Sequence, residues 1–261
     1  MTGQFKIDLS QKFEQLRDPP IVEAVLQWRA PAGMELSKES LQEALSAELP
    51  DYPMQQDHYE TQVQFQFPMG DDADASSAVW NGGWKGLRLV SADSRNIAIF
   101  SQNSFTYSRL KPYEGWEAFE AEARRLWGIF GKLAQPDSVD TVGLRFINRI
   151  PVERDKDLAN YLKEPPSKPG GLPLVSLLYQ SGFQVEQEGL FVNVVKTLHE
   201  NPERELGLIL DIDVGTREGL LREPGQDFDA TLPKMRWLKN MLFFELLKPE
   251  LIESFKQGGT E

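Results

Sequence analysis

Two arginines and one asparagine lie on one predicted strand, residues 141–152, in a pattern that could bind an anion. Arg145 and Arg149 are four positions apart, so a strand places both on one face and Asn148 on the other. Guanidinium groups bind carboxylates and phosphates through paired hydrogen bonds. Arg145, Asn148 and Arg149 are therefore the candidate ligand- or anion-binding residues. The alternative is an ion pair between an arginine and Glu23 or another acidic residue on a neighbouring strand.

Asp211 and Asp213 are a candidate metal site on the predicted strand 205–216. Their spacing places both carboxylates on one face, about 7 Å apart at Cα, where they could hold Mg²⁺ or act as an acid and base pair. The alternative is an ordinary solvent-facing side of the strand, because a half-buried strand needs polar residues there.

Glu186 and Glu188 repeat this spacing on a third predicted strand, residues 183–188. A Glu-x-Glu pair on a strand is similar to the carboxylate pairs of tunnel enzymes that cleave triphosphates. Those sites also need basic residues interleaved on neighbouring strands to hold the phosphates. Such residues are missing here and Leu190 follows the pair, so the sequence disfavours this activity.

Other catalytic chemistries are excluded by composition and by absent motifs. The 261 residues include no Cys and two His, which removes thiol nucleophiles, disulfides and Cys-ligated metals. The chain also lacks a Gly-x-Ser-x-Gly elbow, a P-loop and a dinucleotide-binding Gly-x-Gly-x-x-Gly. No catalytic residue can be named, and we expect no cofactor.

Charge and hydropathy indicate the kind of partner. With 40 Asp and Glu against 28 Lys and Arg, the net charge is −12, which argues against direct nucleic-acid binding. No apolar run is long enough for a membrane helix, and the first 16 residues are too polar for a signal peptide. We expect a cytoplasmic protein that binds another protein. Trp80 and Trp84, in or beside a polar loop, are candidate protein-contact residues.

The pattern of hydrophobic residues predicts alternating strands and helices. Residues 61–67 alternate strictly, while residues 114–134 repeat hydrophobic residues every three or four positions and predict a long helix. Further strands are predicted at 19–29, 84–92, 96–109, 141–152, 183–188, 190–199 and 205–216. Further helices are predicted at 37–49, where Ser37 is the cap, at 155–162 and at 230–247, where Asp229 is the cap.

This order of elements predicts an α+β protein of two similar halves, residues 1–135 and 136–261. Each half would form an antiparallel sheet covered on one face by a long helix, because strands with one apolar side need a cover. The two sheets would join into one continuous or saddle-like sheet. The repeat is one of elements, because residues 21–30 and 142–151 share no convincing identity.

Four motifs resemble a sporadically distributed, uncharacterised family of bacterial proteins of about this length. The motifs are Pro20–Val25, Ser101–Tyr107, Gly143–Ile150 and Leu238–Phe244, and the resemblance extends from Pro20 to about Phe255. It implies no established activity, substrate or catalytic residue. The patchy occurrence of the family suggests carriage on mobile or defence-associated islands.

Two hypotheses about function follow. The first is a non-enzymatic binding or regulatory protein of antitoxin, immunity or defence-accessory type, whose acidic surface and aromatic loop contact a protein. The second is an enzyme or small-anion-binding protein with a pocket between the sheet and the long helices. In that pocket Arg145 and Arg149 would anchor the anion, with Asp211 and Asp213 as metal ligands or acid and base. Self-association through exposed sheet edges stays open.

Overall fold

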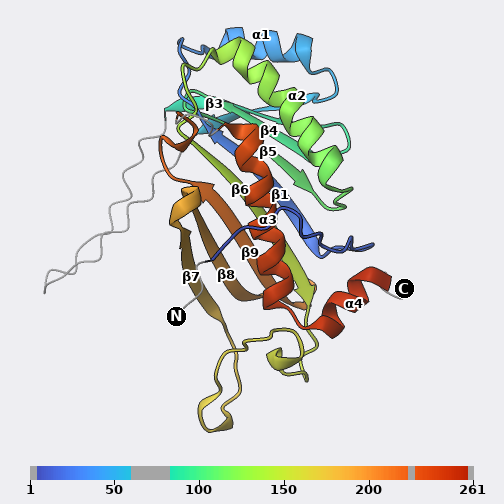
Figure 1. The fold of residues 1–261 in the computed structure, drawn as a ribbon. Coiled ribbons are helices and arrows are strands. Elements are labelled where there is room, and N and C mark those ends of the chain that lie inside the picture. The colour runs from blue at the N-terminus through green and yellow to red at the C-terminus, as the bar shows by residue number, and fades with distance from the viewer. Residues whose placement is uncertain (1–4, 60–82, 223–226, 258–261) are drawn as a thin grey trace, which may run out of the picture.

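The computed structural model describes residues 5–59, 83–222 and 227–257. The chain is an α+β protein, as predicted, built on one antiparallel sheet of nine strands in the order β2-β3-β4-β5-β1-β6-β9-β8-β7. The long helices lie on one face of this sheet (Figure 1). The strands are β1 (Ile21–Arg29), β2 (Met54–Tyr59), β3 (Trp84–Val90), β4 (Asn96–Ser101), β5 (Ser104–Leu110), β6 (Thr141–Pro151), β7 (Leu178–Val185), β8 (Leu190–Glu200) and β9 (Leu206–Thr216).

The centre of the sheet is the antiparallel pair β1 and β6. Leu26 lies opposite Leu144 and Trp28 opposite Val142 in this pair. Strands β5, β4, β3 and β2 continue the sheet on the side of β1, and β9, β8 and β7 continue it on the side of β6. The two edges are therefore β2 and β7.

Capping residues mark the start of α1, as predicted, and the end of α2. Ser37 caps α1 (Lys38–Glu48) by accepting a hydrogen bond from the Ser40 amide. Gln135, in the left-handed conformation, ends α2 (Trp116–Ala134). The remaining helices are α3 (Phe228–Leu246) and α4 (Pro249–Gln257). Within the described ranges, no helix combines the length and the hydropathy needed to cross a bilayer.

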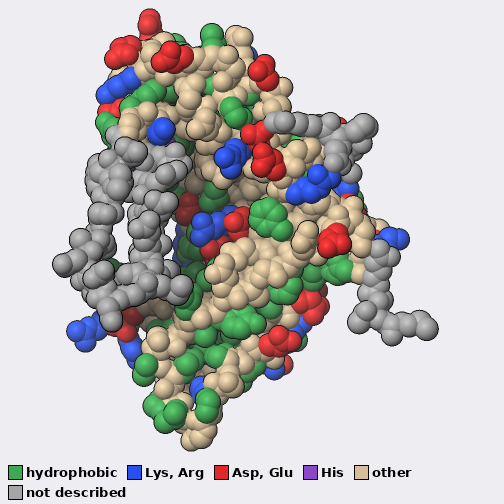
Figure 2. Space-filling view, turned by 90° about the vertical axis from the view of Figure 1, so that its left-hand side faces the viewer, with side chains coloured by type: hydrophobic (Ala, Val, Ile, Leu, Met, Phe, Trp, Pro, Cys, Tyr) green, Lys and Arg blue, Asp and Glu red, His purple; other side chains and the backbone are tan. Residues whose placement is uncertain are grey.

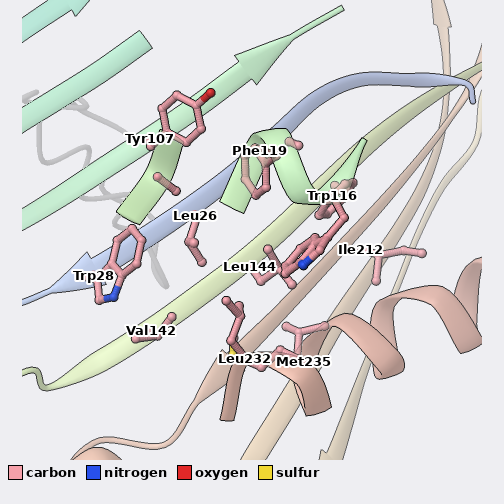
Figure 3. Packing of buried hydrophobic residues seen from close by; sticks show 14 of the residues in the cluster. Leu26, Trp28, Tyr107, Trp116, Phe119, Val142, Leu144, Ile212, Leu232 and Met235 are labelled. Atoms are coloured by element: carbon pink, nitrogen blue, oxygen red, sulfur yellow. The ribbon is translucent and has the colours of Figure 1, made fainter. Parts of the chain in front are cut away.

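The core lies between the helices and one face of the sheet (Figure 3). Alternate residues of β1, β6 and β9, among them Leu26, Leu144 and Ile212, are fully buried beneath α2 and α3. The core is rich in aromatic side chains, and the Trp28 and Trp127 rings stack with their centroids 5.1 Å apart. Because strand side chains alternate, the neighbouring residues point to the opposite face, which the long helices do not cover.

Several predicted elements differ from the structure. Residues 96–109 form two strands, β4 and β5, because the chain turns at Gln102 and Asn103. The cap of α3 is Asp227, which accepts from the Ala230 amide, and Asp229 lies in the first turn. The strands β2 and the first half of β7, and the helix α4, were not predicted. The predicted strand 61–67 lies outside the described residues.

Two predicted elements form 3-10 turns instead. Only Leu158–Asn160 of the expected helix 155–162 is helical, with Asp157 capping this short turn. Glu186–Glu188 is also a 3-10 turn, closed by Gly189 in the left-handed conformation. The glutamates of this segment therefore do not share a strand face, which removes the geometric basis for a paired-carboxylate site there.

The alternation along β1 predicts the cost of core truncation. Replacing buried Leu26 with Ala leaves a cavity beneath α2, so we expect a loss of about 2–5 kcal/mol in the free energy of unfolding. Its exposed neighbour Gln27, on the other face, is the control, and Gln27→Ala should change that energy by about 0.5 kcal/mol or less. Urea denaturation measures both. Equal losses would contradict the assignment of the two faces.

Candidate functional site

Arg145 forms an ion pair on the face of the sheet that the long helices leave open. Its Nε and Nη2 donate to the two carboxylate oxygens of Asp211 on β9, at 2.9 and 2.6 Å. The Asp211 side chain is almost buried, and the paired geometry satisfies both of its oxygens. The two residues that the sequence singled out separately therefore contact each other, in the ion pair that was the alternative interpretation of Arg145.

Arg149 lies on the same face as Arg145 but engages the chain itself. Its side chain lies over Gly207, the residue opposite Pro151 in the β6–β9 pair, and a Cβ there would come within 2.9 Å of its Nε. Its Nη2 donates to the Glu205 carbonyl at 3.0 Å. Arg149 thus closes the end of the sheet near the turn before β9.

Asp213 lies beside this pair, directly opposite Arg145 in the strand register. Burial raises the pKa of the Asp213 carboxyl, Arg145 opposes that increase, and the charge of Asp211 adds to it. Among the described residues, no group of three or more His, Asp or Glu side chains is arranged to hold a metal ion. Asp211 and Asp213 share a face, as predicted, but Asp211 is already bound to a guanidinium.

Asn148 points to the opposite face of β6, toward the helices, and is 1% exposed. Its Nδ2 donates to the Leu210 carbonyl at 2.9 Å across the β6–β9 pair. The predicted cluster is thus divided by the sheet: the two arginines lie on the open face and Asn148 on the covered one. Arg145 and Arg149 do not line a space between sheet and helices.

Asn148 lines a cavity of about 670 Å³ between the sheet and α3. Its walls come from the N-terminal segment before β1, the first turn of α2 and the middle of α3. The charged and polar residues that matter most there are Arg17, Glu117, Asn148, Arg236, Lys239 and Asn240. A volume of this order is typical of sites that bind small molecules.

Lys239 is the unusual residue of this cavity. Its Nζ lies 4.0 Å from the centre of the Phe146 ring on β6, and no carboxylate of the described residues pairs with it. Burial, together with the charge of Arg236 one turn earlier on α3, lowers the pKa of Lys239 to about 7. Lys239 was not among the candidate residues predicted from the sequence. It lies four residues after buried Met235, and this helical spacing could have indicated that it faces the interior.

A second notable surface is β7, one edge of the sheet. Leu178, Tyr179 and Phe183 are 79%, 51% and 49% exposed, and Val175 just before the strand is 90% exposed. Figure 2 shows hydrophobic side chains gathered over the lower part of this side of the molecule, where β7 and the preceding loop lie. We call Leu172, Val175, Leu178, Tyr179 and Phe183 the β7 patch. Sequence reasoning missed it, because exposure of an edge depends on which strands pair.

The predicted aromatic contact residues are only partly described. Trp84 begins β3, is half-buried against the core, and donates from Nε1 to Asp57 on β2 at 3.1 Å. It therefore fastens β2 to β3, and its indole is not a free surface group. Trp80 lies outside the described residues.

Sequence comparisons with known families and curated proteins give no match: no protein-family model matches the chain, and no curated protein shows significant sequence similarity to it. The resemblance carried by the four sequence motifs stays a prediction. Function is therefore inferred from the cavity, the open face and the β7 patch themselves.

The raised pKa of Asp213 predicts how stability depends on pH. The folded protein holds this proton more tightly than the unfolded chain, so the ionised carboxyl destabilises the fold once the pH exceeds its folded-state pKa. Asp213→Asn should raise the free energy of unfolding at pH 7 and give no gain at pH 3, where the native carboxyl is protonated in both states. Exposed Asp155→Asn is the control. A gain for Asp213→Asn that is the same at both pH values would refute this assignment.

Proposed function

We propose that this chain is a non-enzymatic protein-binding protein whose partner adds a β-strand to the edge strand β7. The observation that carries the proposal is the β7 patch on an unpaired edge. Long, apolar edge strands pair readily with other chains, and natural proteins normally protect them with charges, prolines, bulges or covering elements. β7 has eight residues, Leu178–Val185, with no charge and no proline among them.

The two sides of the sheet support this assignment. Moving outward from the centre, β1, β5, β4 and β3 correspond in order to β6, β9, β8 and β7. On the first side β2 pairs with β3, and α1 packs against β3. On the second side, β8 pairs with the inner edge of β7, and no described strand pairs with its outer edge. A partner strand beside β7 would occupy the place that β2 takes beside β3.

The same correspondence supports the finer proposal that the chain consists of two similar halves. Each half runs from a central strand through three consecutive antiparallel strands to a 19-residue helix, α2 or α3. The halves then differ at their outer edges, since β2 and α1 belong to the first alone. A duplication in which the second half has no counterpart of β2 and α1 would account for the difference between the protected edge and the apolar edge.

Strand addition also sets the chemistry of the partner. Main-chain hydrogen bonds would supply much of the affinity, and side chains that alternate along the added strand would select the sequence. The hydrophobic β7 patch favours a partner segment with apolar side chains. The net charge of −12 favours partners whose surrounding surface is basic. A regulatory role of antitoxin, immunity or defence-accessory type is the setting that the family resemblance adds to this proposal.

Charged substitutions on β7 test the proposal. Leu178→Lys combined with Phe183→Lys places two cations where an added strand must pack, so we expect about a tenfold or greater loss of partner binding. The measurement is quantitative mass spectrometry, with isotope labels, of the proteins that tagged wild-type and variant chains capture from native lysate. Binding of the purified partner is then measured by calorimetry.

Met54→Lys is the matched control, because Met54 is an exposed hydrophobic residue of the other edge strand, β2. It should leave capture unchanged. Light scattering of the purified wild-type chain reports self-association, and amide exchange locates the contact, because β7 amides should become protected when the partner binds. A partner retained equally by all three chains, with unprotected β7 amides, would refute strand addition at this edge.

A further inference from the structure

The cavity beneath α3 lies on a different part of the molecule from β7, and it is built to neutralise negative charge. Its floor is the covered face of β6, where Asn148 lies, and its walls are the segment before β1, the start of α2 and the middle of α3. The charges of its walls determine what it can bind.

The carboxylates of the cavity are paired with cations. Glu114 accepts from Arg109 at 2.8 Å, and Glu14 pairs with Lys256. Arg109 and Lys256 lie outside the cavity lining, so both carboxylates have cationic partners that the cavity does not supply. Lys256 also pairs with Glu253 at 2.9 Å and is shared between the two glutamates. The third, Glu117, lies 3.8 Å from Arg236.

Two cations of the cavity lining have no acidic partner among the described residues. Lys239 and Arg17 both line the cavity, and no described carboxylate pairs with either of them. Arg236 lies over the Trp116 ring, 4.8 Å from its centre, three residues before Lys239 on α3. An anion placed between Lys239 and Arg236 would relieve the repulsion between these two like charges.

The start of helix α2 borders the same space. Helix α2 begins at Trp116 after Gly115, which has φ 120° and offers no side chain to cap the helix. The first amides of a helix lack intrahelical acceptors, and the helix dipole favours negative charge beside them. Gly115, Trp116 and Glu117 all line the cavity, so these donors add to the side-chain cations.

One buried acceptor lies in the floor. Asn148 is 1% exposed, and both of its described hydrogen bonds are donated by Nδ2, to the carbonyls of Leu210 and Phe146. Its Oδ1 accepts no hydrogen bond from the described residues. Because Asn148 lines the cavity, this oxygen is available to accept a hydrogen bond from a ligand there.

We propose that this cavity binds a small organic oxyanion, a carboxylate or a phosphate monoester, that also carries a hydrogen-bond donor and an apolar body. Lys239, Arg236 and the first amides of α2 hold the anionic group. Asn148 Oδ1 accepts from the donor, and the rings of Trp116, Phe243 and Phe244 contact the apolar body. This site is independent of the proposed binding of a partner at β7.

The test uses inorganic phosphate, phenyl phosphate and 4-hydroxybenzoate as probes of the full-length chain. Calorimetry measures affinity, and NMR shifts of the Asn148 side-chain amide and the Trp116 indole report where each probe binds. We expect phenyl phosphate and 4-hydroxybenzoate to bind more tightly than inorganic phosphate and to shift the Trp116 signal. 4-Hydroxybenzoate, which has a hydroxyl donor apart from its anionic group, should also shift the Asn148 signal. Because the lysine must be protonated, affinity should fall by about tenfold for each pH unit above 7.

Lys239→Met removes the central cation with little change in shape and should weaken binding by about tenfold or more. Lys132→Met removes an exposed cation at the other end of α2 and is the matched control, expected to bind as wild type. Arg236→Gln should also weaken binding and serves if Lys239→Met fails to fold. Lys239→Met should still capture the β7 partner, which separates this site from the proposed protein-binding function.

The site is refuted if no probe binds the wild-type chain at millimolar concentration. It is equally refuted if Lys239→Met and Lys132→Met weaken binding to the same extent, since the probe would then respond only to overall charge. Binding that leaves the Asn148 and Trp116 signals unmoved would place the anion elsewhere and overturn the assignment.

Discussion

The antiparallel pairing of β1 with β6 is the contact on which the rest of the molecule depends. It joins the strands formed by the first part of the chain to those formed by the second, and its register aligns Leu26 with Leu144 and Trp28 with Val142. Because side chains alternate along a strand, this register sends the hydrophobic residues of both strands to one face. A shift of one residue would expose them and bury Arg145 instead.

The long helices cover only one face of the sheet, and this affects the open face, the cavity and the edge strand β7. On the open face, charges must be neutralised within the sheet, as Arg145 and Asp211 do. On the covered face, α3 crosses β6 near Asn148 and leaves a cavity where the segment before β1 and the start of α2 meet it. At the outer end, β7 lies beyond any described helix and keeps its hydrophobic side chains exposed. The two proposed binding surfaces thus arise from the same limited cover.

These surfaces suit different ligands because their physical environments differ. The β7 patch offers main-chain hydrogen-bonding groups and apolar side chains in an extended row, which matches a polypeptide strand. The cavity offers cations, the start of a helix and aromatic walls around one hollow, which matches a small anion. Lys239 can lose its proton near neutral pH, because burial and the nearby charge of Arg236 lower its pKa to about 7. An anion in the cavity would stabilise its charged form.

The sequence by itself determined the elements with strong local signals. Alternation defined β6 and β9, the prolines at 19 and 20 marked the entry to β1, three-and-four spacing defined α2, and Ser37 marked the start of α1. These signals depend only on neighbouring residues. It also determined that Arg145 and Arg149 share a face opposite Asn148. Only the tertiary structure decided that Arg145 pairs with Asp211, that Lys239 faces a cavity and that β7 is an edge. These features depend on strand order and on helix packing, which join residues far apart in the chain and leave no local periodic signal.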